Sequence, residues 1–301
     1  MKRKMYCVVI LLGSLLVVTN SFSQLKKRIA VFTFEDKSSH SWRWWDGKPP
    51  GDGMADMLTT TLVKSGKYIV IERQAIAKMI QEQRLGQAGL VTAQSAAQVG
   101  KLLGVELAVV GAVTEFGHAK GGTGGRIKGI GIGVKKQQAT VAVDVRFVNT
   151  TTGEILAAEN VRKEKSKSGI SISTSQFNFN NRNDFDNSLV GKATREAVDA
   201  IVDLIDAQMK QLPWEGKVIL VRGNTVFIKP GSDAGVKVGD IFSIYSKGEE
   251  LIDPDTGLSL GSVETKVGSI EVTSIVTGGK AAQASIKMGG GFKKGDLVRL
   301  N

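Results

Sequence analysis

The chain has 301 residues, of which 42% are hydrophobic and 23% are charged, so it can bury a core and is not disordered by composition. Its formal net charge is +11, and it holds one cysteine, Cys7, and two histidines, His40 and His118. This inventory excludes a disulfide framework, a structural zinc site and a cysteine nucleophile.

The first residues have the pattern of a secretory signal peptide. Lys2-Arg3-Lys4 is a basic start, residues 6–18 form an apolar run, and Ser21 and Ser23 are small residues placed before a cleavage site after residue 23. The apolar run is too short to span a bilayer of about 30 Å. We therefore expect an exported protein whose only cysteine, Cys7, leaves with the peptide, so that the mature chain carries no lipid. Export also argues against nucleic acid as the partner of this basic chain.

Strand and helix patterns alternate through residues 28–212. The apolar run at 29–34 predicts a buried strand, and the helical period at 54–63 predicts a helix that ends before Gly66. The remaining elements expected in chain order are a strand at 68–71, helices at 72–84 and 93–103, strands at 107–113 and 140–148, a turn at 149–153, and a returning strand from 154. This order predicts a sheet with packed helices.

The segment 186–212 is the clearest helix, because its apolar residues form one stripe. Asp186, Asn187 or Ser188 caps its start, and Pro213 ends it. From residue 218 on, short strands with glycine turns replace the helical period, which predicts a small barrel or sandwich. The predicted organisation is a signal peptide at 1–23, an α/β domain at 24–213 and a small all-β domain at 214–301.

Two similar segments stand out in the all-β part. Residues 235–241 read GVKVGDI and residues 291–297 read GFKKGDL. We interpret both as turns that lead into barrel strands.

No catalytic set can be assembled from the sequence. The two histidines lie far apart, and no GxSxG or HExxH motif accompanies either. Residues 253–257 lack the remaining ligands of a calcium loop and are typical of a turn. The glycine-rich stretch 121–133 lacks the ending of a phosphate-binding loop. The sequence therefore predicts a protein that is not an enzyme and has no metal and no cofactor.

Two segments, near 121–138 and 163–184, alternate apolar residues with small ones. Ile130, Ile132 and Val134 share one face of the first segment, and glycines occupy the other. In the second segment Ile170 and Ile172 oppose serines, and Phe177 and Phe179 fall on the second face. Two interpretations stay open. Such ribbons suit a water-filled transmembrane barrel, but the alternation covers about half of the 9–11 residues that a membrane strand needs, which favours flexible periplasmic loops.

The segment SWRWWD at 41–46 contains Trp42, Arg43, Trp44 and Trp45 in a loop between the first strand and the first helix. Clustered aromatic residues on a surface usually mark a contact site. These tryptophans line a pore, grip a partner, or fold back as a lid over the core.

The quoted residues resemble the curli-secretion channel family (CsgG) through most of 27–212. The similarity rests on order and spacing as well as on residue identity. The segments that carry it are IAVF at 29–32, IERQ at 71–74, GAVTEFG at 111–117, GIGIG at 129–133 and VDVRFVNTTTGEIL at 143–156. Residues 216–300 resemble the small C-terminal β-domain of the flagellar assembly protein T.

The resemblance implies a periplasmic α/β domain that assembles into a homo-oligomeric ring. Each subunit of that family lends two hairpins to one shared outer-membrane barrel, which exports unfolded amyloid subunits through a constriction. The loop with Trp42, Arg43, Trp44 and Trp45 falls where the family has its constriction. The segments 121–138 and 163–184 fall where it has its hairpins. The family's channel is a lipoprotein, whereas no cysteine stands at the expected mature start here.

The sequence thus predicts an α+β chain: a periplasmic α/β domain with two candidate transmembrane hairpins, followed by a small barrel-like domain. The expected function is secretion of unfolded surface-fibre subunits at the outer membrane, with accessory periplasmic or surface assembly proteins as further partners. The alternative is a soluble periplasmic scaffold that stabilises a pilus, flagellar or cell-wall machine without forming a pore.

Overall fold

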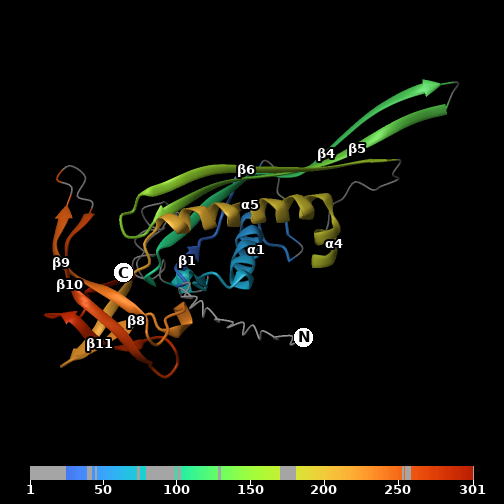
Figure 1. Ribbon diagram of the computed structural model, residues 1–301. Helices are drawn as coiled ribbons and strands as arrows, with labels where there is room; N and C mark the ends of the chain where they lie inside the picture. Colours follow the sequence, from blue (N-terminus) through green and yellow to red (C-terminus); the bar gives the residue numbers. More distant parts are fainter. Residues whose placement is uncertain are drawn as a thin grey trace, which may run out of the picture.

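The computed structural model describes residues 25–38, 43–44, 46–72, 75–78, 99, 103–127, 130–169, 181–252, 254 and 259–300. Two units are built from these residues, a mixed sheet with helices on it and a closed six-stranded barrel (Figure 1). The mixed α+β class expected from the sequence is confirmed at this level. The signal-peptide prediction lies outside the described residues.

The sheet has the strand order β3-β1-β4-β5-β6, with the short β2 also paired to β4. Its strands are β1 (Arg28–Val31), β2 (Glu35–Asp36), β3 (Ile69–Val70), β4 (Leu107–Ile127), β5 (Ile130–Asn149) and β6 (Ile155–Gly169). β1 runs parallel to both of its neighbours, whereas β4, β5 and β6 form an antiparallel meander. The meander supplies the long strands of the molecule, and the short parallel strands anchor them to the core.

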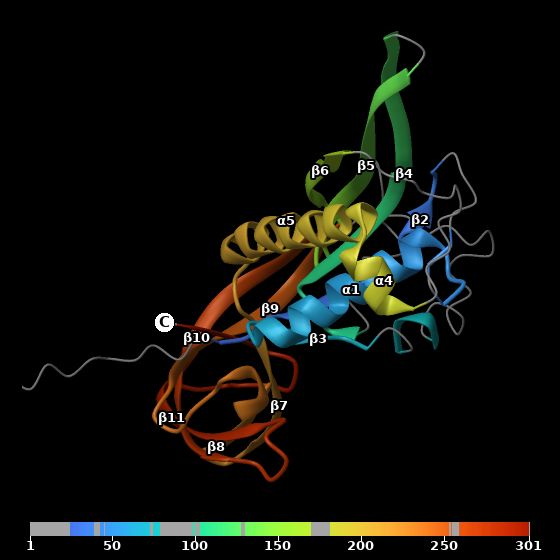
Figure 2. The same ribbon diagram turned by 90° about the vertical axis from the view of Figure 1, so that its right-hand side faces the viewer.

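Helices α1 (Pro50–Ser65) and α5 (Leu189–Gln211) pack together against one face of the sheet (Figure 2). The stripe predicted on α5 is buried, including Val198, Ile201 and Ile205. These side chains meet Val143 and Phe147 of β5 in the main core. Because successive side chains of a strand point to opposite faces, the residues between these buried ones lie on the other face of the sheet.

The segment predicted as one helix at 186–212 is two helices, α4 (Arg182–Asn187) and α5. Ser188 separates them, with an extended backbone at φ −73° and ψ 162°. Its hydroxyl oxygen accepts a hydrogen bond from the amide of Gly191 at 2.9 Å, so the predicted cap is confirmed at this residue. Ser188 is both the residue at which α4 ends and the residue that caps α5, so the two helices do not continue into one another.

The first helix is longer than the predicted 54–63, because Pro50 begins it and Ser65 ends it. Proline is favoured in the first helical turn, where its missing N–H costs nothing. Gly66 follows in the left-handed region at φ 66°, as a helix C-terminus prefers. Residues 75–78 are helical. The rest of the predicted helix at 72–84 and most of that at 93–103 lie outside the described residues.

The barrel follows α5 through the short connection that contains Pro213. Its closed strand order is β10-β11-β8-β7-β12-β9, which confirms the barrel-like prediction. The strands are β7 (Gly216–Arg222), β8 (Thr225–Lys229), β9 (Ile241–Ile252), β10 (Ser259–Ile275), β11 (Ala282–Gly289) and β12 (Leu297–Leu300). Trp214 stacks on Phe242 in its core, with ring centroids 5.3 Å apart. The barrel lies at the opposite end of the sheet from the tip of the β4–β5 hairpin (Figure 1, Figure 2).

The two similar segments of the barrel fold alike. The Lys237 amide donates to the Asp240 carboxylate at 2.8 Å, and the Lys293 amide donates to that of Asp296 at 2.7 Å. In each, a glycine at positive φ precedes the aspartate. β9 and β12 start directly afterwards, so the prediction of turns that lead into strands is confirmed.

Candidate functional site

The β4–β5 hairpin is one continuous antiparallel ladder from the pair Leu107 and Asn149 to the pair Ile127 and Ile130. A single bulge near Thr114 interrupts the register. The sequence predicted only 107–113 and 140–148 as strands, because the glycine-rich continuation has little β propensity. The hairpin projects well beyond the helices that cover the sheet (Figure 1).

The pairing register divides the outer part of this hairpin into two different faces. Ile130 pairs with Ile127, Ile132 with Gly125, and Val134 with Thr123, so these positions share one face. The alternate pairs form the other face. They are Arg126 with Gly131, Gly124 with Gly133, and Gly122 with Lys135. Over these outermost pairs, the positions of one face therefore hold apolar or small residues and those of the other hold glycine and basic residues. Nearer the sheet, the first face continues with Lys136 paired with Gly121.

β6 continues the sheet beside β5 as far as the pair of Gly169 with Lys135. It contains the first residues of the second predicted hairpin, 163–184. Ile170, Ile172, Phe177 and Phe179 lie outside the described residues, so their membrane assignment stays a prediction.

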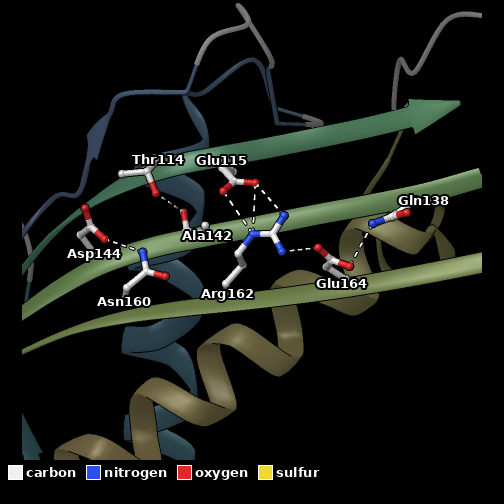
Figure 3. Close-up of polar contacts among 8 residues, drawn as sticks. All are labelled: Thr114, Glu115, Gln138, Ala142, Asp144, Asn160, Arg162 and Glu164. Carbon is white, nitrogen blue, oxygen red and sulfur yellow. Dashed lines mark hydrogen bonds and ion pairs between the residues drawn. The ribbon is translucent and has the colours of Figure 1, made fainter.

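A polar network covers the sheet face opposite α1 and α5 (Figure 3). Arg162 of β6 reaches across β5 to Glu115 of β4, with its Nε and Nη2 donating to the two carboxylate oxygens at 3.2 Å each. Arg162 also pairs with Glu164, whose other oxygen accepts from Gln138 at 2.9 Å. The hydrogen bond with Glu115 is the main cause that raises the pKa of Arg162.

A separate polar contact lies on the same face of the sheet. The Asn160 amide donates to the Asp144 carboxylate at 2.6 Å, again between β6 and β5 (Figure 3). These groups are exposed, so they add little to stability and instead present a fixed polar surface to solvent or to a neighbour. This surface was not predicted from the sequence. The sequence pattern that indicates it is that Asn160, Arg162 and Glu164 stand at every second position. The lysines at 163, 165 and 167 occupy positions of the other set.

The tryptophan loop divides between core and surface. Trp44 is only 4% exposed, and its ring lies 4.4 Å from that of Phe185 and 5.8 Å from that of Phe116, centroid to centroid. Trp44 therefore packs in the core, and the assignment of the loop to a pore constriction stays a prediction. Arg43 is exposed. Trp42 and Trp45 lie outside the described residues.

Two charged groups stand where the sheet meets the barrel. The Nζ of Lys27 donates to the carbonyl oxygens of Met209 and Leu212 at the end of α5, and burial lowers its pKa. Glu106 accepts from the amide of Arg28 at 2.7 Å, and burial raises its pKa to about 7. Both residues tie the start of β1 to neighbouring elements.

Among the described residues, no three histidine, cysteine, aspartate or glutamate residues lie close enough together to hold a metal ion. None of their helices combines the length and the apolar character that crossing a membrane requires.

One protein family matches the sequence of this chain. The model of the family described as "Curli production assembly/transport component CsgG" matches residues 14–221. Proteins of that description from Escherichia coli K12 and Salmonella typhimurium are 33% identical over 113 residues, which is 36% of this chain and 41% of each relative. The chain thus matches about two fifths of the length of these curated relatives.

Solved structures resemble the chain more distantly. The hypothetical protein CT253 from Chlamydia trachomatis has a TM-score of 0.40 at 17% identity, over 60% of this chain and 96% of that one. The LpoB C-terminal domain from Escherichia coli has a TM-score of 0.32 at 13% identity, over 46% and 82%. The PelC dodecamer from Paraburkholderia phytofirmans has a TM-score of 0.28 at 13% identity, over 58% and 84%.

Proposed function

This chain belongs to the CsgG family of curli production assembly/transport components, and on that premise we propose that it forms a curli-type secretion ring in the outer membrane. In this proposal the chain is exported to the envelope and assembles with copies of itself. The copies close one shared barrel through which unfolded surface-fibre subunits leave, helped by accessory assembly proteins. The role is transport rather than catalysis.

The observation that carries the proposal is the two-faced outer part of the β4–β5 hairpin. Lipid-facing and water-facing positions alternate along the strands of a transmembrane barrel. The ladder from Gly117 paired with Thr140 to Ile127 paired with Ile130 has 11 residues on each strand. A membrane strand needs about 9–11 residues. The ladder is thus long enough. Ile127, Ile130 and Ile132 share one face at its outer end, and Lys136 and Gln138 continue that face toward the sheet.

The unpaired outer edges of β4 and β6 favour assembly into a ring. Among the described residues, no strand pairs with β4 beyond Val113 on its outer side, and none pairs with the outer edge of β6. Unpaired backbone groups are not tolerated in the hydrocarbon layer, so a single copy could not insert alone. Edges contributed by neighbouring copies would satisfy each other and close the barrel.

The loop 41–50 supplies the constriction in this proposal. Trp44 anchors the loop by its burial, and the exposed Arg43 lies beside it. Trp42 and Trp45 flank these two residues in the sequence. A ring repeats each residue once per subunit, so the aromatic residues would form collars that contact an unfolded chain without requiring hydrogen-bond partners.

One observation favours the alternative of a soluble periplasmic scaffold. The edge strand β6 carries Lys163, Lys165 and Lys167, and lysines on an edge strand are a common device against pairing with another chain. A scaffold would use the polar face around Arg162 and Glu115 to contact its machine and would need no membrane insertion.

A matched pair of variants separates the two functions. Ile132→Arg places a charge on the apolar face of the hairpin, whereas Gly131→Arg places the same charge one residue away on the other face. An arginine facing lipid at the bilayer midplane costs roughly 2–4 kcal/mol, while the lumen face tolerates it. We expect I132R to lose membrane fractionation and the rings seen by negative-stain imaging of detergent extracts. G131R should keep both.

The same experiment contradicts the pore if the two variants behave alike. Unchanged fractionation of both, with no rings from the wild-type protein, would favour the scaffold. Circular dichroism of each variant checks that the α/β unit remains folded, because the substituted residues lie near the tip of the β4–β5 ladder.

A further inference from the structure

The three long strands β4, β5 and β6 carry different charges on their two faces. One face is the side on which α5 packs, since Lys165 of β6 forms an ion pair with Glu196 of α5 at 2.5 Å. From Phe116 to the tip of the described ladder, the pairing register places cations and no carboxylate at the positions of this face. We call it the cationic face, and its cations are Lys120, Arg126, Lys135, Lys163, Lys165 and Lys167.

The opposite face of the same strands is balanced in charge. From Glu115 outward, its described positions hold the cations Arg162 and Lys136 and the carboxylates Glu115 and Glu164. Arg162 pairs with both of these carboxylates in the network of Figure 3. Toward the tip this face becomes the apolar face of the hairpin. The excess positive charge of the three strands is therefore concentrated on one face.

The cationic face is on the lumen side of the proposed pore. Lipid-facing and lumen-facing positions alternate along a barrel strand, so if the apolar face meets lipid, the cationic face meets water. The loop of the proposed constriction lies on the same side, because Phe116 occupies a position of the cationic face and its ring lies 5.8 Å from that of Trp44. In the outer ladder, the other positions of this face are glycines, which leave the lumen wide.

On the premise of the proposed pore, we propose that the cationic face lines its lumen and selects acidic unfolded polypeptides as cargo. A ring repeats every cation once per subunit, and rings of lysine and arginine favour anions in a pore. A channel with walls of one charge also focuses the field and concentrates the opposite charge. An unfolded chain exposes its charges along its whole length, so its net charge decides whether it is drawn in or repelled.

The ion selectivity of the channel tests the charge of the lumen. In planar-bilayer recordings of the full mature chain across a KCl gradient, we expect chloride to permeate more readily than potassium. Lys135→Gln and Lys136→Gln remove the same charge from neighbouring positions on opposite faces. K135Q should lower the chloride-to-potassium permeability ratio, and K136Q should leave it unchanged. Gly131→Arg adds a cation to the cationic face and should raise the ratio.

Two unstructured peptides of equal length, one glutamate-rich and one lysine-rich, test the cargo preference. Current blockades count their entries into the channel. At low salt the glutamate-rich peptide should enter about tenfold more often or better, because electrostatic focusing changes association rates by roughly 10–10³. The difference should shrink at 1 M salt, where the screening length is about 3 Å. The triple variant K120Q/R126Q/K135Q should lose the preference and still form rings in negative-stain images.

The outcomes separate this inference from the pore on which it rests. A wild-type protein that forms no channel contradicts both. A channel that favours potassium, or admits both peptides equally, overturns the cargo selection and leaves the pore standing. Equal shifts in K135Q and K136Q would overturn the assignment of the cationic face to the lumen. Entry of polygalacturonate, an acidic polysaccharide, without entry of the glutamate-rich peptide would replace the polypeptide cargo by a polysaccharide.

Discussion

The indole ring of Trp44 lies directly over Gly53 of α1, where a Cβ atom on residue 53 would overlap the ring. Because Gly53 has no side chain, the indole ring of Trp44 can pack against this position of α1. The rings of Phe116 of β4 and Phe185 of α4 also pack against the indole. The tryptophan thus fixes the loop at 43–49 to a helix, a strand and a second helix at once.

Trp44→Ala should reduce the free energy of unfolding by about 3–5 kcal/mol, the usual cost of emptying a large buried aromatic site. Urea unfolding followed by circular dichroism measures it. Arg43→Ala is the matched control, because Arg43 is exposed and adjacent, and its loss should leave the unfolding midpoint nearly unchanged. Equal effects of W44A and R43A would contradict the core assignment of Trp44.

Lys27→Met should cost about 1 kcal/mol of stability, because it removes the donor to the carbonyl oxygens of Met209 and Leu212 at the end of α5. Methionine preserves the packing of the aliphatic stem. Lys26→Met is the control, since the hydrogen bond of Lys26 to Ala234 uses the backbone amide and survives the substitution. Chemical unfolding of both variants compares them, and a loss confined to K26M would contradict the capping role of Lys27.

Glu106 predicts a pH dependence of stability. Burial raises its pKa from 4.5 to about 7, so between these values the folded chain holds a proton that the unfolded chain releases. The contribution of Glu106 to folding stability should therefore fall as pH rises from 4.5 to 7 and stay constant above that. Glu106→Gln keeps an oxygen to accept from the Arg28 amide but does not titrate.

Urea midpoints of wild type and E106Q at pH 5 and at pH 8 measure this contribution. The wild-type midpoint should fall more between the two pH values than the E106Q midpoint, and E106Q should be the more stable protein at pH 8. Parallel profiles would show that Glu106 titrates at the same pH in the folded and unfolded chains.

The core elements of this fold could be predicted from sequence because their burial is periodic. The stripe of Val198, Ile201 and Ile205 gave α5, and the alternation of Val143, Val145 and Phe147 gave β5. The break at Ser188 was not predicted, because residues 182–187 contain one apolar residue, Phe185, and so have no period in which an interruption could be seen. The glycine turns of the barrel were predictable from their repeated pattern, since each turn needs positive φ at one fixed position.

The site was harder to predict, because it depends on contacts between distant segments. Nothing in the sequence near Trp44 distinguishes it from Trp42 and Trp45, and its burial requires Gly53 and Phe185. The full length of the β4–β5 hairpin was also hidden, since glycine-rich strands depend on pairing rather than on propensity.

Combined replacement of Trp42 and Trp45 by alanine tests the proposed constriction. If these two residues form aromatic collars in a ring, the variant should keep the unfolding midpoint of the wild type and conduct more current in planar bilayers, because removing both rings widens the path. W44A should instead lower the midpoint, and this contrast separates an anchoring tryptophan from pore-lining ones. The measurement therefore pairs a urea unfolding curve with a conductance recording for each variant. A W42A/W45A protein that loses as much stability as W44A, with unchanged conductance, would place all three tryptophans in the core and remove the loop from the pore.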